Sequence, residues 1–171
     1  MKSLCSLGFT LVEIVIFVVV FSLGVMGVMT IFYNTLGKTS DPTLRLQGVQ
    51  TAQAVLEEIY LKKFDENTPN GGGKITVYST FGIDAGENSI SKYDDVDDFV
   101  NTCGNEKNFS SADFGLKNGY NVAVKVSYAQ ISPSNNITET CSVTDYKFIT
   151  VTVTNPSVNE KYNLKVLKGN F

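Results

Sequence analysis

Hydrophobic side chains form one long run near the start of the chain and give way to alternating patterns toward its end. From Ile14 to Gly37 no side chain is charged, and a helix needs about 20 apolar residues to cross a bilayer. We therefore expect residues 9–37 to form a transmembrane helix. Residues 38–171 suit one globular domain, since most domains have about 100–150 residues.

A second helix is predicted directly after the apolar run. The residue before a proline avoids helical geometry, so Asp41 and Pro42 mark a break in the first helix or its end. Asp41 is also a good N-cap and Pro42 a good first helical residue, which predicts a new helix over residues 42–64. Apolar residues recur there every three or four positions, which indicates an amphipathic helix packed on a sheet, with Gly48 allowing a close approach. The stripe consists of Leu44, Gly48, Ala52, Val55, Leu56 and Ile59.

The C-terminal half alternates apolar and polar residues, a pattern typical of antiparallel strands with one covered face. The predicted strands are 74–80, 120–129, 146–154 and 162–167. A turn at 155–157 predicts a hairpin between the last two. Loop-forming residues dominate 81–119, with a short helix near 93–102. The expected fold class is α+β. Its long N-terminal helix, transmembrane in the first half and amphipathic in the second, packs on a roughly four-stranded antiparallel sheet.

One carboxylate interrupts the apolar pattern. Glu13 is the only side chain between Phe9 and Gly37 that is charged at neutral pH. A charged side chain well inside hydrocarbon costs roughly 2.5–3.5 kcal/mol on insertion scales, so an intramembrane carboxylate indicates a functional site with a partner. Gly8 lies directly before the apolar run. A cut after Gly8 would release an α-amino group at Phe9, a cation near neutral pH, about one helical turn from Glu13.

The sequence GFTLVE at residues 8–13, followed by a long apolar helix, resembles the signal of type IV pilins and pseudopilins. This resemblance implies that residues 1–8 are a leader peptide and that a prepilin peptidase cuts between Gly8 and Phe9. The same enzyme would methylate Phe9, and Glu13 would neutralise the N-terminus of a neighbouring subunit during assembly. The alternative is an ordinary single-pass anchor with a stray glutamate.

Residues 41–59 and 93–99 resemble a narrower group, the MshD-type minor pilins of the mannose-sensitive haemagglutinin (MSHA) pilus. This implies a low-abundance subunit that helps to initiate or cap a fibre and contacts other pilins through its N-terminal helix. Such a protein spans the bacterial inner membrane before assembly and lies on the pilus at the cell surface afterwards. A type II secretion pseudopilin and a non-polymerising, membrane-anchored binding module are the alternative functions.

Charge and composition argue against two other classes of function. The net charge is −3 and the lysines and arginines are scattered, so no nucleic-acid partner is predicted. The chain contains no histidine, the commonest general base and metal ligand. No other catalytic motif takes its place, and we predict that the protein is not an enzyme.

Three cysteines are present, and Cys5 belongs to the expected leader. Cys103 and Cys141 remain as a pair in a domain that would face an oxidising compartment. We predict that they form a disulfide, which would stabilise the domain by roughly 2–4 kcal/mol. Two unpaired buried thiols are the alternative.

An acidic run lies within the loop-rich region, at Asp94, Asp95, Asp97 and Asp98. Ca²⁺ takes six to eight oxygen ligands, so such a run can form part of a calcium site. The spacing of an EF-hand is missing, however, and on a helix the four acids would face different directions. We therefore expect a solvated acidic surface, with Ca²⁺ as the alternative and no other cofactor.

Overall fold

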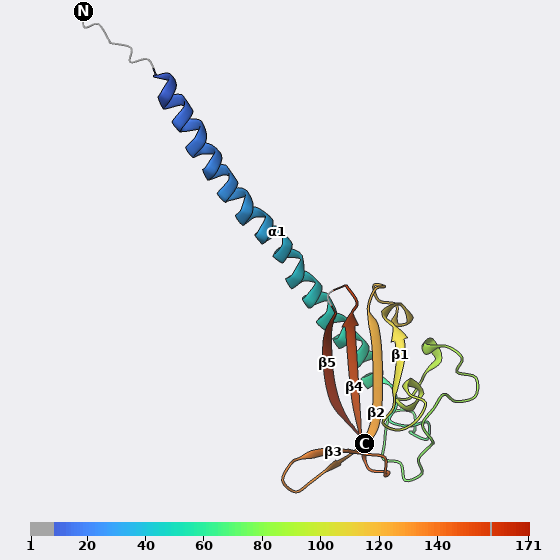
Figure 1. Ribbon diagram of the computed structural model, residues 1–171. Helices are drawn as coiled ribbons and strands as arrows, with labels where there is room; N and C mark the ends of the chain where they lie inside the picture. Colours follow the sequence, from blue (N-terminus) through green and yellow to red (C-terminus); the bar gives the residue numbers. More distant parts are fainter. Residues whose placement is uncertain (1–8, 158) are drawn as a thin grey trace, which may run out of the picture. The chain divides into compact units, whose positions relative to one another are not determined.

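The computed structural model describes residues 9–157 and 159–171 (Figure 1). It divides into two compact units, one that ends at Thr43 and one that begins at Leu44. Helix α1, Leu11–Leu61, contributes residues to both.

Helix α1 continues through Pro42, so the predicted break at Asp41 and Pro42 is wrong. A proline inside a helix removes one N–H donor and crowds the carbonyl four residues earlier, at a cost of about 3 kcal/mol. Here helix-favouring patterns lie on both sides of the proline, an apolar run before it and the amphipathic stripe after it. These patterns keep the backbone helical across the defect. The helix ends at Leu61, three residues before the predicted end at residue 64.

The second unit is an antiparallel sheet covered by the last part of α1 (Figure 1). The strand order is β1-β2-β4-β5, and β3 pairs with the end of β2. β4 and β5 form the predicted hairpin, and the α+β class is confirmed. The strands are β1 (Glu106–Ser110), β2 (Asn121–Ile131), β3 (Ile137–Thr140), β4 (Tyr146–Asn155) and β5 (Glu160–Gly169).

The main core lies between α1 and one face of β2 and β4. The predicted apolar stripe is confirmed, because Ala52, Val55 and Ile59 are completely buried there. Alternate side chains of a strand point to the same face, so branched residues of the two strands meet as cross-strand pairs beneath the helix. These pairs are Val122 with Val153, Val124 with Val151, and Val126 with Ile149.

Gly48 provides the close approach that the sequence predicted. A Cβ atom at this position would lie 2.1 Å from Cε2 of Tyr162 on β5, so the aromatic ring occupies the space of the missing side chain. The Tyr162 hydroxyl donates to Glu160, which also forms an ion pair of 2.7 Å with Arg45 of α1. Helix and sheet edge are thus joined by both packing and charge.

Segment 74–80 is not a strand, contrary to the prediction. Its backbone is held by a side chain instead: Ile75 N–H donates to Oδ1 of Asn170, and Nδ2 of Asn170 donates to the Ile75 carbonyl, both at 3.0 Å. An amide side chain near the C-terminus therefore takes the place of a strand partner.

Elsewhere the structure differs from the prediction in two short strands and in the form of the expected helix. β1 and β3 were not predicted, because they are short and their side chains do not alternate cleanly between buried and exposed. The helix expected near 93–102 is instead a single 3₁₀ turn, η2 (Asp97–Phe99), and another such turn, η1 (Ile90–Lys92), lies just before this range. A further 3₁₀ turn, η3 (Ser111–Phe114), follows β1.

Candidate functional site

The first described residues carry part of the predicted assembly site. Gly8 and the leader lie outside the described residues. Phe9 is 76% exposed. Thr10 directly precedes α1, and its Oγ1 accepts a hydrogen bond of 3.3 Å from the backbone N–H of Glu13. Glu13 thus lies in the first turn of the helix, with its side chain exposed.

The Thr10–Glu13 pair is a feature that our sequence analysis missed. Thr-x-x-Glu is the pattern of a helix capping box, in which the threonine side chain satisfies a free N–H group of the first turn. A carboxylate is also favoured near the positive end of the helix dipole. Among the described residues Glu13 has no ion-pair partner. Its position is therefore fixed by the first turn of the helix, while no cation among the described residues neutralises its charge.

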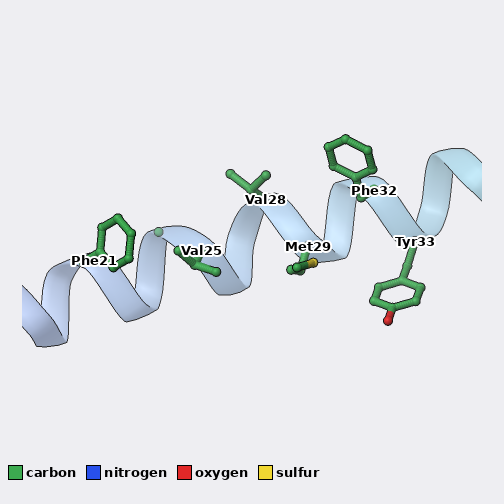
Figure 2. A pocket seen from close by; sticks show the side chains of 7 residues that line it. Phe21, Val25, Val28, Met29, Phe32 and Tyr33 are labelled. Atoms are coloured by element: carbon green, nitrogen blue, oxygen red, sulfur yellow. The ribbon is translucent and has the colours of Figure 1, made fainter.

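The apolar part of α1 is exposed along its whole length within this chain. Leu11–Thr35 has a mean hydropathy of 2.8 and is long and apolar enough to cross a membrane. None of it is buried. Figure 2 shows apolar side chains projecting from more than one side of the helix between Phe21 and Tyr33. A helix that is apolar all round requires apolar surroundings, which lipid or other helices can provide. The labelled side chains are Phe21, Val25, Val28, Met29, Phe32 and Tyr33.

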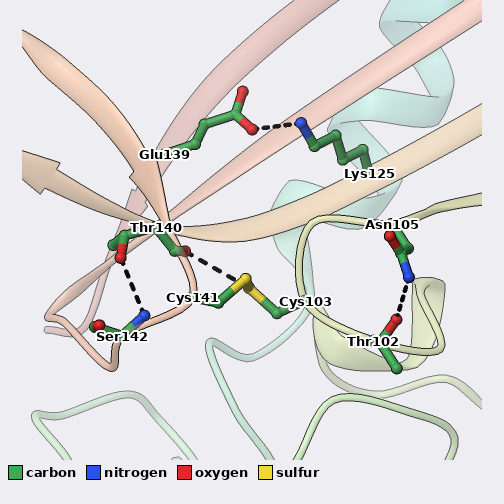
Figure 3. The surroundings of a disulfide bond; sticks show 8 residues. All are labelled: Thr102, Cys103, Asn105, Lys125, Glu139, Thr140, Cys141 and Ser142. Carbon is green, nitrogen blue, oxygen red and sulfur yellow. Dashed lines mark hydrogen bonds and ion pairs between the residues drawn. A yellow bond between two sulfur atoms is a disulfide. The ribbon is translucent and has the colours of Figure 1, made fainter.

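The predicted disulfide is present between Cys103 and Cys141, whose Cα atoms lie 5.8 Å apart (Figure 3). Cys103 lies in the turn before β1, and Cys141 directly follows β3. The bond therefore connects the segment before β1 to the segment after β3, and both of these strands pair with β2. It closes a covalent loop across the sheet, which restricts the unfolded chain.

The expected solvated acidic surface is wrong. Asp95, Asp97 and Asp98 are no more than 1% exposed, and only Asp94 is partly exposed, in an ion pair of 2.7 Å with Lys63. The reason is that the intervening Tyr93, Val96 and Phe99 are buried in the core, which draws the acidic residues inward with the backbone.

Two of these aspartates hold the turn together by accepting backbone hydrogen bonds. Oδ1 of Asp95 accepts from the N–H groups of Asp97 and Asp98 at 2.6 and 3.3 Å. Oδ2 of Asp98 accepts from the N–H groups of Asp94 and Asp95 at 3.1 and 3.2 Å. One oxygen of each side chain is therefore fixed by the backbone of the run.

Asp97 faces a lysine that the sequence analysis did not single out. Lys147 is completely buried, and its Nζ lies 2.6 Å from Oδ2 of Asp97 and 3.6 Å from Oδ2 of Asp65. The same ammonium donates to the Phe64 carbonyl at 2.7 Å. Burial raises the pKa of Asp97 to about 7, although the neighbouring Lys147 opposes this shift.

Aromatic rings surround the buried ammonium of Lys147. Its Nζ lies 4.4 Å from the ring centre of Phe64, 5.4 Å from that of Phe81 and 5.5 Å from that of Tyr128. Ring faces attract cations, so these contacts add to the two carboxylates. The arrangement connects the end of α1, the acidic run and β4, and we interpret it as a structural ion pair rather than a catalytic one.

The other buried aspartates approach acids from distant parts of the chain. Oxygens of Glu66, Asp84 and Asp95 lie within 4.8 Å of one another, and so do oxygens of Asp84, Glu87 and Asp98. Burial raises the pKa of Asp95 to about 6, and burial together with the Asp95 and Glu87 carboxyls raises the pKa of Asp98 to about 8. Our sequence analysis missed these three partners, because acids scattered in a loop give no spacing signal.

The four acids of the run therefore do not share one site. Asp94 and Asp97 pair with lysines, whereas Asp95 and Asp98 belong to the two groups of carboxylates. No protein-family model, curated protein or solved structure matches this chain.

Proposed function

We propose that this protein is a minor pilin, a membrane-anchored subunit that a prepilin peptidase cleaves after Gly8 and that helps to initiate or cap a type IV pilus fibre. One observation carries the proposal. An exposed apolar helix, Leu11–Thr35, contains a single carboxylate, Glu13, which has no ion-pair partner among the described residues. The partner would be the amine of Phe9 on an adjacent subunit.

Before assembly the helix would span the inner membrane, with residues 44–171 on the non-cytoplasmic side. The Cys103–Cys141 disulfide supports this side, because disulfides persist in oxidising compartments. During assembly the helix would move from lipid into a bundle of like helices. Since both surroundings are apolar, this transfer has little hydrophobic driving force.

The ion pair between Glu13 and the neighbouring Phe9 amine would then select the register between subunits. A buried ion pair contributes little net stability, but breaking it by removing one partner costs about 3–5 kcal/mol. A subunit out of register would leave both charges unpaired in apolar surroundings. The pair therefore acts through the penalty on wrong neighbours.

The first test is the mass of the natural protein in the membrane and fibre fractions. We expect a chain that starts at Phe9 and carries one N-terminal methyl group. A natural chain that keeps residues 1–8, or that is cut after the apolar helix, would overturn the proposal, because no amine would then be released next to Glu13.

The second test compares two charge-removing variants of α1. Glu13→Gln should still insert into the membrane but enter fibres about tenfold less or worse, because it leaves the neighbouring amine unpaired. The matched control is Glu57→Gln, since Glu57 is exposed on the same helix and accepts only a local bond from Gln53. Equal amounts of both variants in purified fibres would contradict the proposed role of Glu13.

A further inference from the structure

Five acids, which we call the carboxylate cluster, meet between the end of α1 and the loops before β1. They are Glu66, Asp84, Glu87, Asp95 and Asp98. Among the residues that the structure describes, none of the five forms an ion pair. Lys63 pairs with Asp94, and Lys147 pairs with Asp97 and Asp65. Lys107 donates to the backbone carbonyl of Asp98 at 2.9 Å but forms no ion pair with a described carboxylate. Five carboxyl groups therefore converge at a place where the described lysines form no ion pair with them.

The spacing of the oxygens fits a bound cation. The cluster consists of two groups of three acids that share Asp84, and within each group the oxygens lie within 4.8 Å of one another. Bonds from Ca²⁺ to oxygen are about 2.3–2.6 Å, so two ligands of one ion are at most about 5 Å apart. Each group thus meets the distance requirement for ligands of a common ion.

A second observation is independent of this spacing. Oδ2 of Asp95 and Oδ1 of Asp98 are buried and have no hydrogen-bond partner among the described residues, and the same holds for Oε2 of Glu87. Asp95 and Asp98 are at least 99% buried, and the backbone bonds described above fix their other oxygens. A buried carboxylate oxygen without a partner is costly, so these oxygens require a ligand.

We propose that the carboxylate cluster binds Ca²⁺, with Asp84 as the ligand shared by both groups. All the candidate ligands are oxygens, which hard cations prefer, and the chain has no histidine to favour a transition metal. Mg²⁺ demands a nearly ideal octahedron and retains its water, whereas Ca²⁺ accepts irregular sets of six to eight oxygens. An irregular cluster on loops therefore fits Ca²⁺ better.

The ion would hold together a region with little regular structure. Between the end of α1 and η1 the structure contains no helix and no strand. Glu66 follows the helix, Asp84 and Glu87 lie in this loop, and Asp95 and Asp98 lie at η2. One ion bound by the group of Glu66, Asp84 and Asp95 would fasten the loop to both of its ends. This inference is independent of the role proposed for Glu13.

The test uses the full chain in detergent micelles, stripped with EDTA and then titrated with CaCl₂. We expect binding heat in calorimetry and a rise in the melting temperature of the sheet domain. The titration should extend into the millimolar range, because extracellular calcium modules bind at about 10⁻⁴–10⁻³ M. MgCl₂ at the same concentration should give a smaller rise. An equal rise with Mg²⁺ would overturn the assignment to calcium.

Asp84→Asn is the decisive variant, because Asp84 belongs to both groups and is exposed, so its replacement leaves the core intact. We expect its calcium affinity to fall by at least about tenfold and its melting temperature in EDTA to match that of the unaltered chain. Glu106→Gln on β1 removes the same charge from an exposed position outside the cluster and should bind Ca²⁺ normally. The proposal is overturned if the unaltered chain gives no binding heat or if Asp84→Asn binds as tightly.

Discussion

The two ends of helix α1 contain similar apolar residues but differ in what covers them. Within Leu11–Thr35 apolar side chains occur on all sides, and none is buried. Within the last turns they form one stripe, and Ala52, Val55 and Ile59 are completely buried against the sheet. The pattern of apolar positions, rather than their number, decides whether a helix is covered by its own chain.

The charged groups differ in the same way. Asp97 lies in apolar surroundings and finds its cation, Lys147, within the domain. Glu13 lies at the start of the apolar helix and finds no cation among the described residues. The sheet domain therefore covers its own apolar core and pairs the buried Lys147, whereas the carboxylate cluster has no ion pair among the described residues. In the apolar helix neither kind of group is covered or paired by the described residues.

Removing the buried cation should have the largest effect on the sheet domain. Lys147→Met keeps the length of the side chain but leaves the Asp97 and Asp65 carboxylates without their ammonium. Breaking a buried ion pair from one side costs about 3–5 kcal/mol, and we expect a loss of this size. The measurement is the free energy of urea unfolding of the full chain in mild detergent.

The control for this variant is Lys161→Met on β5, whose side chain is exposed. It removes the same charge and should change the free energy of unfolding by less than about 0.5 kcal/mol. If the two variants lose equal stability, the contacts of the Lys147 ammonium are not what stabilises the domain.

The position of Lys147 could have been predicted from the alternation of β4. Lys147 has the same parity as Ile149, Val151 and Val153 in the predicted strand 146–154, and all three are buried. A lysine on a core-facing position needs an anionic partner, so the strand pattern alone implies a buried ion pair. The partners Asp65 and Asp97 are distant in sequence, and no local rule identifies them.

Periodic elements were predicted well because their signal is local. The stripe of α1 and strands β2, β4 and β5 all follow from the spacing of apolar residues. Segment 74–80 has the composition of a strand, but its pairing groups are taken by Asn170, which only the fold brings near. The acidic run was misjudged for a related reason, since its burial depends on where Tyr93 and Phe99 pack.

Loss of the disulfide should have the second largest effect. The double variant Cys103→Ser/Cys141→Ser removes a covalent link across 38 positions and should lower the free energy of unfolding by roughly 2–4 kcal/mol. Cys5→Ser is the matched control and should change nothing, because Cys5 lies in the proposed leader. Urea unfolding of the unaltered chain with and without a reductant gives a second reading of the same quantity. An unchanged midpoint in the reduced protein would show that packing alone fixes these loops.

The smallest predicted effect compares glycines from the two ends of α1 directly. In Gly48→Ala the new methyl group would lie 2.1 Å from Cε2 of Tyr162, so the ring must move away from the helix, at a cost of about 1–3 kcal/mol. In Gly24→Ala a new Cβ meets nothing within 4 Å, and the change should leave the unfolding of the sheet domain unaltered. Alanine also favours a helix over glycine by about 1 kcal/mol, so propensity alone would make both variants neutral or more stable. A loss of stability confined to Gly48→Ala thus isolates the helix–sheet contact. An equal free energy of unfolding for the two variants would mean that the Tyr162 ring moves aside without cost. The two ends of α1 would then differ less in their packing than their burial indicates.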